Sequence, residues 1–237
     1  MLAQLPLEFK LLDDATFSGF FAGSNQQLLF ALQNFLDLNN TQEFFFYLWG
    51  QHEVGKTHLL QACCNSALEN NIQAIYVSLK NILDVSNVAS NADFFDGLEN
   101  VSLLCLDDAQ LISSNSCLEE KLFYLFNNIR AKKHKLIIAA NLPPNSLKIQ
   151  LPDLKSRMAW GITYHLHELT EQEKIEALMM RAMQIGLQLS EVVAKFLLSR
   201  ISRSTGQLFS ILERLDIASM AAKRKLTVPF VKEVLGL

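Results

Sequence analysis

The stretch GQHEVGKTHLL, residues 50–60, decides the fold. It follows the apolar run 44–49 and opens a segment with helical spacing, so it stands between a buried strand and a helix. The pattern Gly-x-x-x-x-Gly-Lys-Thr in that position predicts a phosphate-binding loop. Its glycines, Gly50 and Gly55, let backbone N–H groups turn inward, and the helix that follows points its positive end at the anion. Lys56 is expected to reach the β and γ phosphates, and Thr57 to offer a hydroxyl to Mg²⁺.

Short apolar runs alternate with helical patterns before residue 170. Five runs are typical of buried parallel strands: 44–49, 74–79, 101–106, 135–140 and 162–166. This alternation predicts an α/β fold with a five-stranded parallel sheet. Helical patterns alone follow Leu169, with Thr170, Ser190 and Thr227 as expected N-caps, which predicts a small helical lid domain. We expect an N-terminal arm over residues 1–12, a nucleotide-binding domain over 13–169 and the lid over 170–237.

Two of the predicted strands end in polar residues at the sheet edge where ligands of open α/β folds collect. The run LLCLDD, residues 103–108, ends in Asp107 and Asp108, and the run AAN ends in Asn141. Asp107 is expected to hold Mg²⁺ through water, and Asp108 to orient or deprotonate the attacking water. Asn141 is expected to hold that water near the γ phosphate, and a turn-forming asparagine is the alternative.

Composition limits the possible partners and location. The net charge of −3 provides no overall positive field for a phosphate backbone, so strong direct DNA binding is not expected. The four cysteines lack C-x-x-C spacing and suit a reduced cytoplasmic setting. Charged residues interrupt the first apolar stretch, and no apolar run approaches the ~20 residues of a membrane span. We expect a cytoplasmic protein without membrane association.

Two longer segments resemble the family of the bacterial replication initiator DnaA. They are TFSGFFAGSNQQLLFALQNF, residues 16–35, and LPDLKSRMAWGITYHL, residues 151–166. The resemblance implies the AAA+ type of P-loop ATPase fold and a site for ADP or ATP. It places the base pocket at Phe21, Ala22 and Gly23, and His58 among the nucleotide-binding residues. It also identifies Arg157 as an arginine finger, inserted into the nucleotide site of a neighbouring subunit.

The ends of the chain are similar to the Hda branch of that family. The segment KRKLTVPFVKEVLGL, residues 223–237, resembles the end of the Hda lid, and no helix-turn-helix DNA-binding domain is expected after it. Near the N-terminus, QLPLEF resembles the short peptide by which replication proteins dock into the DNA polymerase III sliding clamp. The resemblance assigns clamp contacts to Gln4, Leu5, Leu7 and Phe9. An arm that packs its leucines on its own core is the alternative.

The resemblance implies negative regulation of replication initiation, in which the clamp-bound protein stimulates ATP hydrolysis by DnaA. By our alignment the family's second lid arginine is replaced by Gly206, which implies weak or no hydrolysis by the chain itself. Either Arg203, three residues earlier, substitutes for it, or no residue does. Two alternatives stay open: a self-standing ATPase that loads or remodels another replication or transposition protein, and a non-catalytic adaptor. A homodimer is possible.

Overall fold

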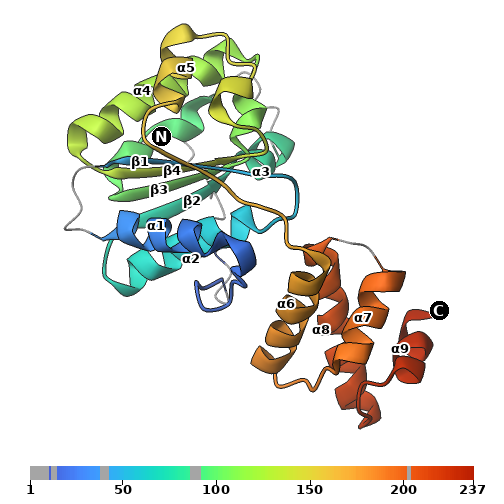
Figure 1. Cartoon of the computed structure of the whole chain (residues 1–237). Helices are drawn as coiled ribbons and strands as arrows, with labels where there is room; N and C mark the ends of the chain where they lie inside the picture. The colour runs from blue at the N-terminus through green and yellow to red at the C-terminus, as the bar shows by residue number, and fades with distance from the viewer. Residues whose placement is uncertain (1–10, 12–14, 38–42, 86–91, 202–203) are drawn as a thin grey trace. The chain divides into compact units, whose positions relative to one another are not determined.

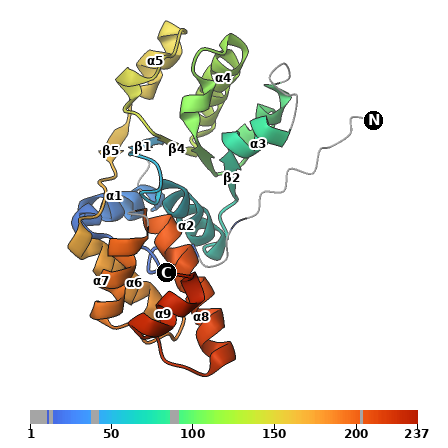
Figure 2. The same ribbon diagram turned by 90° about the vertical axis from the view of Figure 1, so that its right-hand side faces the viewer.

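One parallel sheet organises the first part of the chain. The computed structural model describes residues 11, 15–37, 43–85, 92–201 and 204–237. The strand order is β2-β3-β4-β1-β5. The strands are β1 (Phe45–Trp49), β2 (Ala74–Ser78), β3 (Leu103–Asp107), β4 (Lys135–Ala140) and β5 (Ile162–His165). Each lies within two residues of its predicted run, and the five-stranded parallel sheet is confirmed. Figure 2 shows β5 at one edge of the sheet and β2 at the other.

Helices cover both faces of the sheet (Figures 1 and 2). On one face lie α1 (Gln26–Leu36) and α2 (Lys56–Glu69), and on the other α3 (Leu79–Val85), α4 (Ser116–Lys132) and α5 (Pro152–Met158). The sequence patterns did not predict α3 or α5. Each has only seven residues, which is about two turns and too short for a 3.6-residue period to stand out.

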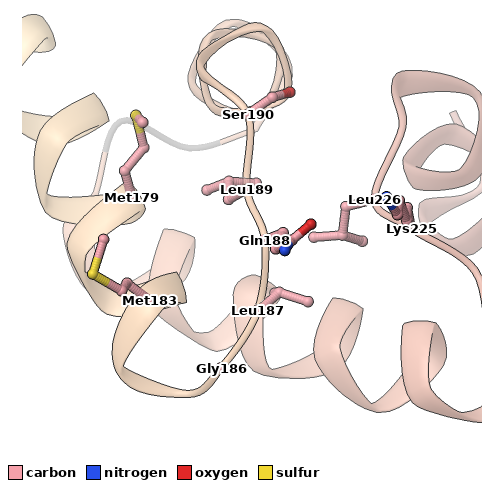
Figure 3. Close-up of a pocket in the computed structure, with 9 residues that line it drawn as sticks. All are labelled: Met179, Met183, Gly186, Leu187, Gln188, Leu189, Ser190, Lys225 and Leu226. Carbon is pink, nitrogen blue, oxygen red and sulfur yellow. The ribbon is translucent and has the colours of Figure 1, made fainter.

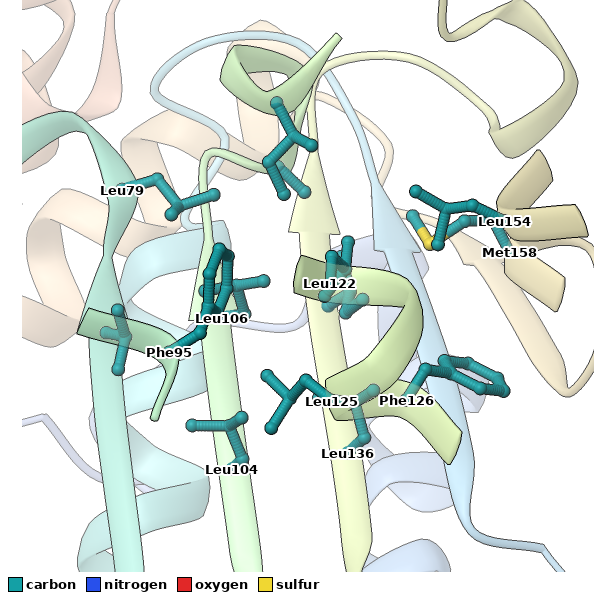
Figure 4. Close-up of a cluster of buried hydrophobic side chains, with 14 of the residues drawn as sticks. Leu79, Phe95, Leu104, Leu106, Leu122, Leu125, Phe126, Leu136, Leu154 and Met158 are labelled. Atoms are coloured by element: carbon teal, nitrogen blue, oxygen red, sulfur yellow. The ribbon is translucent and has the colours of Figure 1, made fainter. Parts of the chain in front are cut away.

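A buried apolar cluster joins α4 to the sheet. Figure 4 shows side chains of α4 facing residues of β3 and β4, and Leu154 and Met158 of α5 directed into the same cluster. Phe126 belongs to this cluster and is fully buried, with its ring edge-on to that of Phe45 at a centroid distance of 5.0 Å. The residues that α4 buries are Leu118, Glu119, Leu122, Leu125, Phe126 and Ile129. The apolar members recur at helical spacing and so share one face, and the buried glutamate was not predicted.

The carboxyl ends of three strands meet at one edge of the sheet. Ladder partners are Trp49 of β1 and Ala140 of β4, and β3 ends beside them at Asp107. The backbone N–H of Gly50 donates to the carbonyl of Ala140 at 3.2 Å, which continues this alignment past the strand. The residue that follows β4 is Asn141. Parallel pairing therefore brings the predicted phosphate loop and the predicted carboxylates to a common edge.

A second compact unit contains the helices after His167 and also takes in the segments Phe21–Asn25 and His52–Gly55. Its helices are α6 (Glu171–Gln184), α7 (Glu191–Arg200), α8 (Thr205–Ala222) and α9 (Val228–Leu235). Each starts with a hydroxyl N-cap that accepts from a backbone N–H of its first turn: Thr170, Ser190, Ser204 and Thr227. Helix α8 ends at Ala222 because Lys223 adopts a left-handed conformation. None of the helices within the described ranges is long and apolar enough to cross a membrane.

Candidate nucleotide-binding site

The predicted phosphate loop joins β1 to α2 through a sharply turned backbone. Gly55 has a φ of 103° and Glu53 a φ of 62°. Glycine takes such an angle without steric cost, which explains the residue type just before the helix. Helix α2 begins at Lys56, immediately after the loop. Because the first N–H groups of a helix lack partners within it, the loop and the start of α2 together offer backbone donors to an anion.

Lys56 is held against the start of this loop. Its side chain is nearly buried, and Nζ donates to the carbonyl oxygens of Gly50 at 2.8 Å and Gln51 at 2.6 Å. Burial lowers the pKa of Lys56, while the carboxylates of Asp107 and Asp108 act in the opposite direction. An ammonium group so placed needs anionic or carbonyl partners. The geometry therefore suits a cation that contacts nucleotide phosphates.

Thr57 and Asp107 bring two hard oxygen ligands together. The Thr57 hydroxyl donates to Oδ2 of Asp107 at 2.6 Å, and the Tyr76 hydroxyl donates to the same oxygen at 3.1 Å. Burial raises the pKa of the Asp107 carboxyl, partly offset by the Thr57 bond. Across the described residues, no group of three or more His, Cys, Asp or Glu could hold a metal. Mg²⁺ at nucleotide sites uses only one or two carboxylates beside phosphate oxygens and water, so this pair fits Mg²⁺.

Gln110 links the second carboxylate to the end of β4. Its Nε2 donates to Oδ1 of Asp108 at 2.9 Å, and its Oε1 accepts from the backbone N–H of Asn141 at 3.1 Å. The amide of a single glutamine can do both because it carries a donor and an acceptor. The structure thus brings Asp108 and Asn141, both predicted from strand ends, into one hydrogen-bonded set. Gln110 itself was not predicted.

Asn141 keeps an unsatisfied polar atom at this edge. Its Oδ1 is buried and has no hydrogen-bond partner in the described part of the chain. A buried acceptor of this kind costs stability unless water or a ligand satisfies it. The backbone of Asn141 is linked through Gln110 to Asp108, and the side-chain oxygen of Asn141 still needs a hydrogen-bond donor. A water molecule could provide that donor. Holding water is the function the sequence suggested for Asn141.

His58, expected among the nucleotide-binding residues, lies against the segment that precedes α1. One ring nitrogen, Nε2, is 2.9 Å from the carbonyl oxygen of Thr16, and its ring lies 5.7 Å from that of Phe20 between centroids. Further along α2, Asn65 donates to the carbonyl of Ala15 at 2.9 Å. The contacts shown for His58 therefore attach the 15–20 segment to α2.

The predicted base-pocket segment, Phe21 to Gly23, is fixed within the second unit. Gly23 has a φ of 49°, and a Cβ there would lie 2.6 Å from Oε1 of Glu173 and 2.9 Å from Leu169. Asn25 accepts from the backbone N–H of His167 at 2.8 Å and donates to the carbonyl of the same residue at 3.1 Å. Both the backbone angle and the lack of space require glycine at position 23.

Arg157 lies on α5, and part of its guanidinium makes no hydrogen bond within the described residues. Its Cζ is 4.1 Å from the ring centroid of Phe123 and 5.8 Å from that of Trp160. Nε and Nη1 are buried and have no hydrogen-bond partner among the described residues. A guanidinium carries five N–H donors and a permanent charge, so an anion that supplied acceptors would satisfy these atoms. The aromatic contacts hold the side chain on the α4–α5 surface.

Several predictions fall outside the described residues. They concern the clamp contacts Gln4, Leu5, Leu7 and Phe9 and the possible substitute Arg203. Sequence reasoning also missed Tyr76 and Gln110. For Gln110 a weak signal existed, since a glutamine two residues after a pair of strand-end carboxylates can reach the second of them. For Tyr76 the apolar strand pattern gave no such signal.

A pocket of about 620 Å³ occurs in the second unit and contains none of the predicted site residues. Figure 3 shows Met179 and Met183 of α6 on one side of the connection 186–190, and Lys225 and Leu226 on the other. Its lining is mostly apolar and lacks grouped phosphate-binding donors. The P-loop edge of the sheet therefore remains the candidate nucleotide site.

Two family models match successive parts of the chain. A model described as the bacterial DnaA ATPase domain matches residues 11–165, and one described as the Hda lid domain matches residues 171–235. An uncharacterized protein of Haemophilus influenzae is 43% identical over 238 residues, covering 100% of both chains.

Solved structures share the fold at lower identity. Domain III of the Thermotoga maritima replication initiation protein DnaA is 20% identical, with 96% of this chain and 98% of that chain covered and a TM-score of 0.77. AMPPCP-bound DnaA from Aquifex aeolicus is 24% identical, with 86% and 66% covered and a TM-score of 0.71. The Thermotoga maritima RuvB branch migration motor is 16% identical, with 96% and 73% covered and a TM-score of 0.66. The AAA+ fold is confirmed, and the chain belongs to the family of the bacterial DnaA ATPase domain, with a lid of the Hda type.

Proposed function

We propose that this protein regulates chromosomal replication initiation by binding ADP or ATP and stimulating ATP hydrolysis by the initiator DnaA. The observation that carries the proposal is Arg157, whose buried Nε and Nη1 have no hydrogen-bond partner in the described protein. Its ring contacts are to Phe123 and Trp160, outside the phosphate loop. Because the residue as a whole is partly exposed, an arginine with unused donors suits contact with a phosphate group supplied by another molecule.

The chain's own nucleotide would be held by the groups at the sheet edge. Lys56 and the N–H groups of the loop would bind the phosphates, and Thr57 with Asp107 would hold Mg²⁺. The metal would neutralise phosphate charge when bound. Asp108 and Asn141 would orient water, with Gln110 fixing both. Arg157 would act separately, on charge that develops in the initiator's site, where a permanent planar cation can lower the barrier substantially.

Docking to the DNA polymerase III sliding clamp is the second part of the proposal. It rests on the peptide QLPLEF, residues 4–9, which has apolar residues for a hydrophobic groove and a glutamine for directional hydrogen bonds. Clamp binding would localise the protein on replicated DNA without any strong DNA affinity of its own. Deletion of residues 1–9 is expected to abolish stimulation in the presence of DNA-loaded clamp while nucleotide binding is retained.

The direct test measures ATP hydrolysis by DnaA with DNA-loaded clamp and increasing amounts of this protein. Wild type is expected to raise the rate, and Arg157→Ala to remove the increase. Arg157→Lys keeps the charge but loses the planar fork, so only partial activity is expected. Arg200→Ala, an exposed arginine of the lid, is the matched control and should behave as wild type. Full stimulation by Arg157→Ala would instead favour a non-catalytic adaptor.

A self-standing ATPase that loads or remodels another replication or transposition protein is the second candidate. It is favoured by the hydrogen-bonded set of Asp108, Gln110 and Asn141, which is arranged as hydrolysis would require. The discriminating measurement is hydrolysis by the purified chain alone. A substantial rate that Asp108→Ala removes, together with no effect on DnaA, would favour this candidate.

A further inference from the structure

A buried glutamate on α4 has only backbone partners in the described chain. Glu119 is 1% exposed. Oε1 accepts from the N–H of Ser114 at 3.1 Å, and Oε2 accepts from that of Leu151 at 2.8 Å. The N–H of Gln150 lies between the two oxygens, at 3.1 and 2.9 Å. A carboxylate this deeply buried is tolerated only with such bonds, because burial of an unpaired charge is very costly.

These bonds join two segments that are distant in sequence. Ser114 follows the short helical turn Ala109–Ile112 that comes directly after Asp108. Gln150 and Leu151 immediately precede α5, the helix that carries Arg157. No side chain caps the start of α5, since Leu151 provides no cap hydrogen bond. The Glu119 carboxylate therefore fixes the chain at the point where α5 begins.

The same face of α4 also contacts the end of α5. Phe123 lies one helical turn beyond Glu119, so the two side chains share a face of α4. The ring of Phe123 is the one that the Arg157 guanidinium lies over. Helix α5 has only seven residues, about 10 Å. A helix this short transmits a shift at its start directly to a side chain in its last turn. Fixing residues 150 and 151 therefore fixes the direction in which Arg157 is presented.

We propose that Glu119 is a positioning residue that sets α5 so that Arg157 reaches the initiator's phosphate. This inference rests on the proposed function, in which Arg157 acts on DnaA. Glu119 touches neither nucleotide nor initiator in this scheme. Glu119 acts through hydrogen bonds to the backbone of residues 150 and 151. Because it also accepts from the N–H of Ser114, it links the start of α5 to the segment that follows Asp108.

The test compares Glu119→Gln with Glu120→Gln. Glutamine has almost the same shape, but its NH₂ group would face backbone N–H donors, so the bonds on one side are lost. Glu120 is the adjacent, exposed residue of the same helix and provides a matched control. For Glu119→Gln we expect the maximal stimulated rate of DnaA hydrolysis to fall at least tenfold. The concentration giving half-maximal stimulation and the affinity for ADP should change less than twofold, and Glu120→Gln should match wild type.

A double variant separates positioning from general damage. In the Arg157→Lys background, which keeps part of the stimulation, Glu119→Gln should lower the maximal rate by less than its tenfold effect in wild type, because both changes act on the same contribution. If Arg157→Ala is inactive while folded Glu119→Gln stimulates fully, the positioning inference is wrong and the proposed function stands. If Arg157→Ala stimulates as wild type does, the proposed function itself is wrong. A Glu119→Gln defect confined to the half-maximal concentration would also overturn the inference.

A second variant keeps the test decisive if Glu119→Gln does not fold. Two glycines inserted between Leu151 and Pro152 leave the buried carboxylate and its backbone bonds in place but detach α5 from them. The insertion is expected to lower maximal stimulation at least tenfold, with the urea unfolding midpoint of the sheet unit retained. Full stimulation by this variant would show that a fixed start of α5 is unnecessary.

Discussion

Asp108 holds a backbone conformation that most residues avoid. Its φ is 59° and its ψ is 37°, a left-handed conformation that costs an L-residue about 1–2 kcal/mol and that aspartate tolerates better than most. Strain of this kind persists only where the surroundings enforce it, and it is frequent at functional sites. Gln110 contributes to that enforcement by holding Oδ1 of Asp108 and the N–H of Asn141 together.

Replacing Gln110 with leucine is predicted to destabilise this edge. Gln110→Leu leaves the Asn141 N–H and one Asp108 oxygen without these partners, which should lower the free energy of unfolding by about 1–3 kcal/mol. Both tryptophans of the chain, Trp49 and Trp160, belong to the sheet unit, so their fluorescence during urea unfolding reports on it. An unchanged unfolding midpoint would mean that the glutamine bridge contributes nothing.

A charge exchange provides the matched control for that prediction. In Asp108→Asn combined with Gln110→Glu, the asparagine amide can donate to the new carboxylate, and the second carboxylate oxygen can still accept from Asn141. Stability should return toward wild type while any slow hydrolysis by the chain, measured in single turnover, stays lost. Such a result would show that the Gln110 hydrogen bonds stabilise the fold, whereas the Asp108 carboxylate is needed for hydrolysis.

Residue patterns predicted the groups that follow strands and missed those that depend on distant contacts. Asp107, Asp108 and Asn141 were found because a buried strand must end at the ligand edge of a parallel sheet. Glu119 was missed because two of its three partners, residues 150 and 151, are more than 30 positions away. Helical spacing placed Glu119 beside an apolar face, where glutamate is ordinarily exposed.

At the scale of elements, α4 owes its position to the apolar stripe that covers the sheet. Phe126 is fully buried, with edge-on ring contacts to Phe44 and Phe45 at 5.2 and 5.0 Å. Phe126→Ala is predicted to cost about 3–5 kcal/mol, the usual range for a core phenylalanine. Phe30→Ala on α1 is the control, since that ring is 67% exposed. Tryptophan-monitored urea unfolding should separate the two variants, and equal losses would contradict this account of the core.

The start of α6 carries a capping box that should respond to pH. Backbone and side-chain hydrogen bonds from Thr170 lower the pKa of the Glu173 carboxyl. A lowered pKa in the folded state means that the stabilisation is present above the ordinary glutamate pKa of about 4.3 and is lost as pH falls through the lowered value. An NMR titration of the Glu173 carboxyl carbon should show this low pKa, and Thr170→Ala should raise it. A Glu173 pKa at or above the ordinary value would contradict the hydrogen-bonded cap.

The whole molecule consists of two units, and the sequence predicted the main content of each. Strand and helix alternation predicted the sheet, and the caps Thr170, Ser190 and Thr227 predicted the starts of α6, α7 and α9. The assignment of Phe21–Asn25 and His52–Gly55 to the second unit could not be predicted. For the first segment the reason is visible, since the pairing of Asn25 with the His167 backbone spans 142 positions. No periodic pattern records such a contact.

Nucleotide binding at the phosphate loop is the central assignment made for this chain, so the most direct measurement is a calorimetric titration of the full chain with ADP and ATP in the presence of Mg²⁺. Wild type is predicted to bind at least one of the two nucleotides. Lys56→Ala should weaken that binding at least tenfold, because Lys56 is the cation held at the loop. Lys80→Ala, an exposed lysine of α3, should bind as wild type does. No binding of either nucleotide by wild type, or equal binding by Lys56→Ala, would contradict the assignment of this loop as the nucleotide site.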